Sequence, residues 1–96
     1  MDREETGCFH FDGEDLIYAE HFPGFPVVPG SLIVDAFTRA IEQNGCELAT
    51  LRLDHFRFRR FLAPGIYRYR LVWLPSGVRC TLYHNDKKAV EGVIRL

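Results

Sequence analysis

A single segment of helical periodicity limits the folds open to this chain. Apolar residues recur at helical spacing over about 31–44, and Asn44-Gly45 supplies a stop signal. Three of the five prolines fall directly before this segment, in HFPGFPVVPG at 21–30. Fixed φ angles and missing N–H groups forbid regular structure there, so we expect a rigid loop that leads into one amphipathic helix.

The remaining sequence is typical of β-strands. Segments rich in β-branched, aromatic and leucine residues are separated by Pro-Gly, Pro-Ser-Gly and Asn-Asp turn signals. Within 48–60 the apolar positions switch from odd to even numbers, which predicts a bulge near Asp54 or His55. The pattern indicates an α+β domain in which an antiparallel sheet curls around the helix. We predict strands at 8–11, 48–60, 66–74, 78–84 and 88–95, of which the last four form a meander.

The size of the chain favours a dimer. Its 96 residues fit one domain, residues 1–96, and a domain this small has a marginal core. The three cysteines are odd in number and widely spaced, and no signal peptide precedes them, which indicates reduced thiols in a cytoplasmic protein. The four histidines show no metal-site spacing, so we predict no metal. A partner subunit is then the expected source of additional stability.

Hydropathy and charge exclude two classes of partner. The longest apolar runs are a few residues, far short of the roughly 20 that cross a bilayer, so we predict no membrane span. A net charge of −1 gives no overall attraction to nucleic acid. A local cluster of arginines could attract an acidic partner, although arginines are also routine on exposed strand faces. These arginines are Arg57, Arg59, Arg60, Arg68 and Arg70.

Three features that could carry chemistry fall within residues 21–35. His21 stands directly before the rigid loop, which would hold its imidazole in a defined position, as a general base requires. Gly30 opens the helix, where unpaired N–H groups stabilise an oxygen that gains negative charge. Asp35 lies on the polar face of the helix, and a partner that covered this face would favour its protonated form. Taken singly, each has a plainer interpretation: a packed loop histidine, a helix start and a solvated carboxylate.

Taken together, these residues identify a family. HFPGFPVVPGSLIVDAF closely resembles the signature of the FabA/FabZ-type 3-hydroxyacyl-[acyl-carrier-protein] dehydratases, in which HFPG, PG and a helix-borne acidic residue occur in that order. The spacing also agrees, since Gly30 and Asp35 follow His21 by nine and fourteen positions. RFRRFLAPG at 57–65 and the closing KKAVEGVI resemble later parts of the family pattern. The chain departs from that pattern at Arg39, Phe61 and Ile66, where glutamine, proline and aspartate are common.

The resemblance implies a hotdog fold, in which an antiparallel sheet wraps one long central helix and two subunits join into a continuous sheet. It implies that His21 of one subunit faces Asp35 of the other, as base and acid in the loss of water from a 3-hydroxyacyl thioester. It assigns substrate binding to Gly30 through its N–H group, to Val27, whose carbonyl would orient His21, and to Phe22. No cofactor is required. The implied substrate is a thioester of acyl carrier protein or coenzyme A, in fatty-acid or polyketide-type synthesis.

Two other functions are compatible with the same residues. Hotdog folds also include thioesterases, in which a carboxylate such as Asp35 activates water or attacks the acyl carbon. The substitutions at Arg39, Phe61 and Ile66 motivate a non-catalytic alternative, in which the chain binds acyl thioesters or completes a heterodimer with an active homologue. The expected assembly is a homodimer, with a heterodimer or a trimer of dimers as alternatives.

Overall fold

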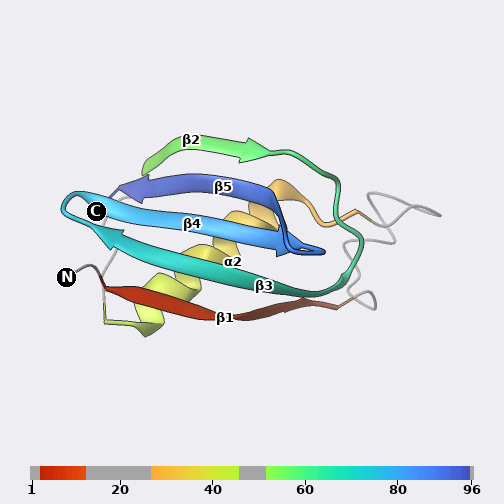
Figure 1. Ribbon diagram of the computed structural model, residues 1–96, viewed down its shortest axis with the longest axis horizontal. Helices are drawn as coiled ribbons and strands as arrows, with labels where there is room; N and C mark the ends of the chain where they lie inside the picture. Colours follow the sequence, from red (N-terminus) through yellow and green to blue (C-terminus); the bar gives the residue numbers. More distant parts are fainter. Residues whose placement is uncertain (1–2, 13–26, 46–51, 96) are drawn as a thin grey trace.

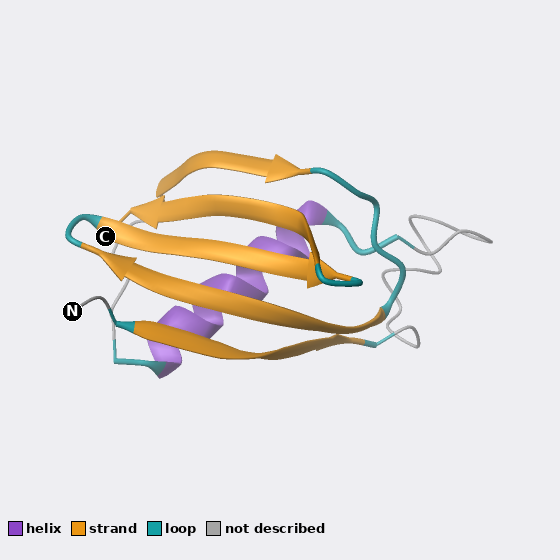
Figure 2. Ribbon diagram, in the orientation of Figure 1, coloured by secondary structure: helices purple, strands orange, loops and turns teal. Residues whose placement is uncertain are grey.

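A five-stranded antiparallel sheet lies across one long helix (Figures 1 and 2). The computed structural model describes residues 3–12, 27–45 and 52–95. The strand order β1-β3-β4-β5-β2 puts β1 and β2 at the two edges of the sheet. The elements in chain order are β1 (Glu4–Phe11), α2 (Gly30–Gln43), β2 (Arg52–Phe58), β3 (Gly65–Leu74), β4 (Gly77–His84) and β5 (Lys87–Arg95).

The helix confirms the predicted periodicity almost to the residue. It begins at Gly30, and the N–H groups of Asn44 and Gly45 donate to carbonyls of its last turn. Gly45 has a φ of 89°, a conformation that glycine adopts readily, so the predicted stop signal is confirmed. The helix buries one face against the sheet, and Phe37 is fully buried at its centre. No helix among the described residues is long and apolar enough to cross a membrane.

Aromatic side chains join the helix to the inner face of the sheet, which we define as the face that packs against α2. The ring of Phe37 lies edge-on to Phe9 of β1, with 5.2 Å between centroids, and at 6.3 Å from Phe56 of β2. Phe9 stacks in turn on Tyr69 of β3 at 4.1 Å. One helix side chain therefore contacts both edge strands, which fixes the position of α2 across the sheet.

The predicted meander is wrong at its first connection. Strands β3, β4 and β5 do follow one another as hairpins, but β2 pairs with β5 and not with β3. A hairpin between β2 and β3 would need a short turn, whereas residues 59–64 form an extended connection across the end of the sheet. Leu62 in this connection is buried, and its carbonyl accepts a hydrogen bond from the Val28 N–H at 2.8 Å. The chain therefore leaves β2 through a connection that is held in place by the buried Leu62, and not through a tight turn.

The first strand is longer than predicted. It begins at Glu4 and not near residue 8, and its side chains alternate between exposed and less exposed positions over all eight residues. The sequence pattern does not show this alternation, because both Glu4 and Glu5 are polar. The Glu4 carboxylate accepts hydrogen bonds from Arg70 of β3 at 2.7 and 3.0 Å, which supports the start of the strand. These hydrogen bonds lower the pKa of Glu4 below its ordinary value.

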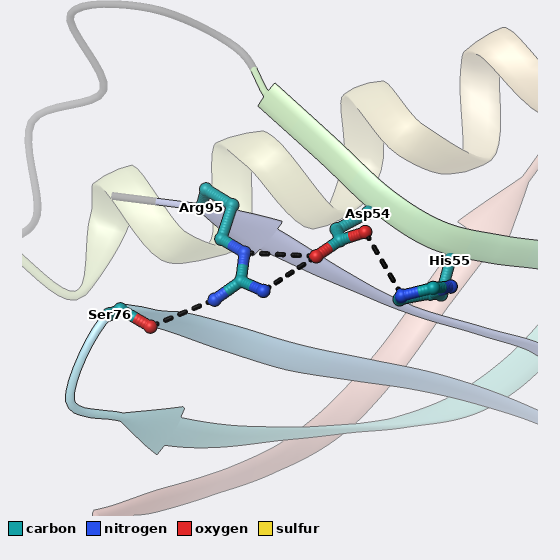
Figure 3. Close-up of polar contacts among 4 residues, drawn as sticks. All are labelled: Asp54, His55, Ser76 and Arg95. Carbon is teal, nitrogen blue, oxygen red and sulfur yellow. Dashed lines mark hydrogen bonds and ion pairs between the residues drawn. The ribbon is translucent and has the colours of Figure 1, made fainter.

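The predicted bulge in β2 is confirmed and anchored from the neighbouring strand (Figure 3). The β2–β5 register shifts between Asp54 and Arg57, and His55 has a positive φ of 54°. Arg95 of β5 donates to Asp54 Oδ2 at 3.1 and 2.6 Å and to Ser76 Oγ at 2.8 Å. The hydrogen bonds from Arg95 lower the pKa of the Asp54 carboxyl. The bulged edge is thus tied to the β3–β4 turn.

The cysteines that the structure describes are free thiols, as predicted. Cys8 is exposed on β1 and Cys80 is buried in β4. Burial raises the pKa of the Cys80 thiol to about 12, so this thiol stays protonated at neutral pH. Cys46 lies outside the described residues.

Candidate active site

A hollow of about 560 Å³ lies between the polar face of α2 and strand β2. Its helix side includes Gly30 in the first turn and Asp35 in the second, and its strand side is formed by apolar side chains. Leu53 and Phe58, both on β2, are each 47% exposed. The lining residues are Gly30, Ser31, Val34, Asp35, Thr38, Leu53 and Phe58. An apolar hollow with one carboxylate and one helix N-terminus is the kind of site in which a charge-forming reaction can be controlled.

Asp35 projects from the helix into this hollow, as its place on the polar face predicted. Its side chain is 51% exposed, and its Oδ2 lies 3.0 Å from Nε of Arg39, one helical turn further on. The hydroxyl of Thr38 donates to the Val34 carbonyl at 2.9 Å and so is committed within the helix. Among the described residues, the ion pair of Asp35 is thus with Arg39 and its carboxylate receives no hydrogen bond from Thr38. An exposed pair of this kind is weak, so substrate or a partner subunit can displace it.

Gly30 lies at the point where the helix meets β2. A Cβ at this position would approach the Phe58 ring at 3.2 Å, which is closer than most side-chain contacts. Helix geometry leaves the N–H groups of Gly30 and Ser31 without an acceptor inside the helix. The N–H groups of Leu32 and Ile33 turn back to the Pro29 carbonyl at 3.0 and 3.3 Å. Glycine thus keeps the helix N-terminus open to a ligand oxygen.

A second hollow, of about 260 Å³, adjoins the first at Gly30 and Phe58. Its walls come from the loop before α2 and from the connection after β2. The hydrogen bond from Val28 to the Leu62 carbonyl holds these two segments together. The lining residues are Val27, Val28, Pro29, Gly30, Ile33, Phe58, Arg60 and Phe61.

The structure brings three of the five predicted site residues around these hollows. Asp35 and Gly30 line the larger hollow, and Gly30 and Val27 line the smaller one. His21 and Phe22 lie outside the described residues, so their predicted roles stay predictions. No group of three or more His, Cys, Asp or Glu side chains within 3–12, 27–45 and 52–95 could hold a metal ion.

Sequence reasoning missed Leu53 and Phe58. The sequence pattern predicts both as ordinary strand residues, yet they form the apolar wall of the hollow that Asp35 lines. The parity switch in β2 was the available signal, because it separates Leu53 from Phe58 by a bulge while leaving both on the helix side of the sheet. What the pattern did not reveal is that β2 is an edge strand.

Comparison with known proteins gives a consistent result. Residues 2–90 match the family model of the ApeI-like proteins, described as ApeI dehydratase. A 3-hydroxyacyl-[acyl-carrier-protein] dehydratase FabZ from Pelotomaculum thermopropionicum is 32% identical over 71 residues, which is 66% of this chain and 51% of that protein. The FabZ of Lawsonia intracellularis is 29% identical over 94 residues, covering 77% and 60%. The chain thus spans about half the length of the curated relatives that it matches.

A solved structure shares the fold. The dehydratase heterocomplex ApeI:P from Xenorhabdus doucetiae contains a chain that superposes with a TM-score of 0.70 at 22% identity, covering 96% of this chain and 85% of that one. The predicted hotdog fold, an antiparallel sheet around one central helix, is confirmed by this likeness and by the strand order.

Proposed function

Because the chain belongs to the ApeI-like dehydratase family, we propose that it removes water from a 3-hydroxyacyl thioester to give the trans-2-enoyl thioester. The proposed substrate is carried by acyl carrier protein, as the names of the FabZ relatives indicate for those proteins, or by coenzyme A. One observation carries the proposal for this chain. Asp35 and the helix N-terminus at Gly30 open into the same apolar-walled hollow, as acid and oxyanion site of an elimination require.

The proposed mechanism divides the reaction between three groups. The thioester carbonyl accepts a hydrogen bond from the Gly30 N–H, which stabilises negative charge as it develops on that oxygen. His21 removes a proton from the α-carbon, and the electron pair of that C–H bond forms the new double bond. The bond from carbon 3 to its hydroxyl breaks, and Asp35 supplies the proton with which the hydroxyl leaves as water. The proton taken by His21 then returns to Asp35 through solvent.

Asp35 needs a different environment for this role than it has in the single chain. At present it is half exposed and paired with Arg39. We propose that a second subunit covers the hollow, excludes water from it and brings its own His21 opposite Asp35. The substrate hydroxyl would then replace Arg39 as the partner of the carboxyl group.

The β2 edge is the proposed surface for that subunit. It leaves Leu53 and Phe58 half exposed beside the hollow, and an exposed apolar edge strand favours pairing with another chain. Pairing of two β2 strands across a two-fold axis would extend the sheet from one subunit into the next. It would also place both copies of the hollow at the interface.

The test is the activity of two purified variants with an enoyl thioester. His21→Ala and Asp35→Asn should each lower kcat by about a hundredfold or more while the far-ultraviolet circular dichroism stays that of the wild type. The product also separates the chemistries, because hydration leaves the thioester intact whereas a thioesterase releases free thiol. Full activity in either variant would contradict the proposal.

A heterodimer is the second candidate for the assembly. The structural neighbour was solved as a dehydratase heterocomplex, and this chain shares its fold. In that case the purified chain alone would be inactive or unstable, and a homologous chain would supply one of the two catalytic residues. A stable, active homodimer would exclude this candidate.

A further inference from the structure

We propose that the smaller hollow beside Gly30 binds the phosphorylated pantetheine arm of the thioester, with Arg60 contacting the phosphate group and Phe61 contacting the arm. This inference rests on the proposed function and names the binding site for the part of the substrate that does not react. Phosphopantetheine is the chemistry that a carrier protein and coenzyme A share.

The two hollows differ in the groups that only one of them contains. Asp35 lines only the larger of the two hollows, whereas Arg60 and Phe61 line only the smaller one. Gly30 and Phe58 line both, so the hollows meet at the site proposed for the thioester carbonyl. The 3-hydroxyl lies on the acyl side of that carbonyl and must reach Asp35, which assigns the acyl side to the larger hollow. The sulfur side of the thioester then leads into the smaller one.

No carboxylate of the described residues pairs with Arg60, so its hydrogen-bond donors are available to a phosphate as far as the described part of the chain is concerned. Arg60 is also exposed. Its neighbour Arg59 is committed, because its Nη2 lies 2.6 Å from Glu91 Oε1. A guanidinium with donors available suits the oxygens of a phosphate ester, and its charge complements theirs.

The side chain of Phe61 is 93% exposed, whereas the next residue, Leu62, is buried. Such high exposure is unusual for a large aromatic side chain. The large hydrophobic side chains that are exposed within the described ranges are Leu53, Phe58, Phe61 and Ile66. Three of these four line at least one of the two hollows, so most of the exposed large apolar side chains gather at the candidate site. Phe58 and Phe61 both line the smaller hollow and give it two aromatic side chains.

The backbone around this site is well anchored. Leu62 and Val28 are 2% and 4% exposed, and the hydrogen bond between them joins the connection after β2 to the loop before α2. Arg59 is fixed from the other side, because its N–H donates to the Ala89 carbonyl at 2.8 Å. Arg60 and Phe61 therefore project from a segment whose position relative to Gly30 is defined, as a binding site requires.

The experiment measures binding, so it does not depend on turnover. The ligands are two stable amides of one 3-hydroxyacyl chain, one on pantetheine and one on phosphopantetheine, titrated calorimetrically into wild-type protein and variants. Arg60→Gln should raise the Kd of the phosphopantetheine amide about tenfold and leave that of the pantetheine amide unchanged. Arg59→Gln is the matched control and should change neither Kd. Phe61→Ala should weaken both amides by the same factor.

Two further ligands show whether the phosphopantetheine arm comes from a carrier protein or from coenzyme A, and they test the proposed binding site separately from the proposed function. The amide on carrier protein and the amide on coenzyme A should both lose affinity in Arg60→Gln, and the natural source is the one that wild-type protein binds more tightly. A loss restricted to coenzyme A would place Arg60 at the nucleotide and overturn the assignment. An equal loss for the pantetheine and phosphopantetheine amides, or no loss for either, would also overturn it. Phosphate-dependent binding without turnover of the thioester would contradict the proposed function alone.

Discussion

The two edges of the sheet are built differently. β1 pairs with β3 through eight consecutive residues without interruption, from Glu4 opposite Val72 to Phe11 opposite Gly65. β2 pairs with β5 through a register shift, and it exposes Leu53 and Phe58. None of the exposed large hydrophobic side chains in the described ranges belongs to β1.

The contrast indicates which edge has a task beyond the fold. A regular edge strand with polar exposed side chains, such as β1, is stable in contact with water. An edge strand that exposes apolar side chains is expected to bind another chain or a ligand. Strand β2 also faces the hollow with Asp35, and β1 does not. The β2 edge is therefore the edge at which assembly and chemistry are proposed to coincide, and three substitutions test that distinction.

The largest effect is expected when a charge is placed on the β2 edge. Phe58→Asp puts a carboxylate at the junction of both hollows and at the proposed interface, so dimers should dissociate and kcat/KM should fall about a hundredfold or more. Sedimentation velocity and steady-state kinetics measure the two outcomes. Ile66→Asp is the matched control, because Ile66 is 69% exposed and lines neither hollow. Equal activity of the two variants would contradict a special role for the β2 edge.

A smaller effect is expected from adding one methyl group near each edge of the sheet, at Gly92 of β5, which lies beside β2, and at Gly7 of β1. A Cβ at Gly92 would overlap the Phe56 ring of β2 and lie 2.8 Å from the Phe56 Cα. Gly92→Ala should thus lower the free energy of unfolding by about 1–3 kcal/mol, because backbone has to move. A Cβ at Gly7 of β1 would meet only the far end of Tyr69, at 2.6 Å from its hydroxyl, which can shift. Urea denaturation should therefore show the larger loss for Gly92→Ala, and the reverse order would be evidence against a tightly held β2.

The smallest effect is expected from the ion pairs that fix the edges. Arg95 lowers the pKa of Asp54 beneath the ordinary 3.8, so this pair stabilises the folded state above that pH and loses its effect as the pH falls below it. Asp54→Asn should reduce Tm by a few degrees at pH 7, and the difference from wild type should vanish in strong acid. Glu4→Gln on β1 should behave alike in Tm, since Arg70 lowers the pKa of Glu4. Only Asp54→Asn should also weaken dimerisation, and a Tm difference independent of pH would refute the assignment.

The sequence predicted what local patterns determine. The helix from Gly30 to Gln43, the bulge at Asp54 and the turns after Leu74 and His84 depend on neighbours a few positions away. The position of β2 beside β5 was not predictable in this way, because strand order follows from long-range pairing and from burial of Leu62.

The site shows the same division. Gly30 and Asp35 are predicted from the helix start, the polar helix face and the family signature, whereas Phe58 joins the site only when β2 is placed against that helix. The difference between Arg59 and Arg60 likewise required the fold, because only the structure shows that Arg59 pairs with Glu91 while Arg60 pairs with no carboxylate of the described residues.

The most direct test of a shared active site is the activity of two inactive variants mixed together. His21→Ala and Asp35→Asn subunits are unfolded and refolded in equal amounts, so that mixed dimers form. Each mixed dimer holds one site with both wild-type residues and one with neither, so about a quarter of wild-type activity should return if half of the dimers are mixed. The same protocol applied to each variant alone should return none. Mixed dimers that form yet remain inactive would contradict the claim that His21 and Asp35 act across the interface.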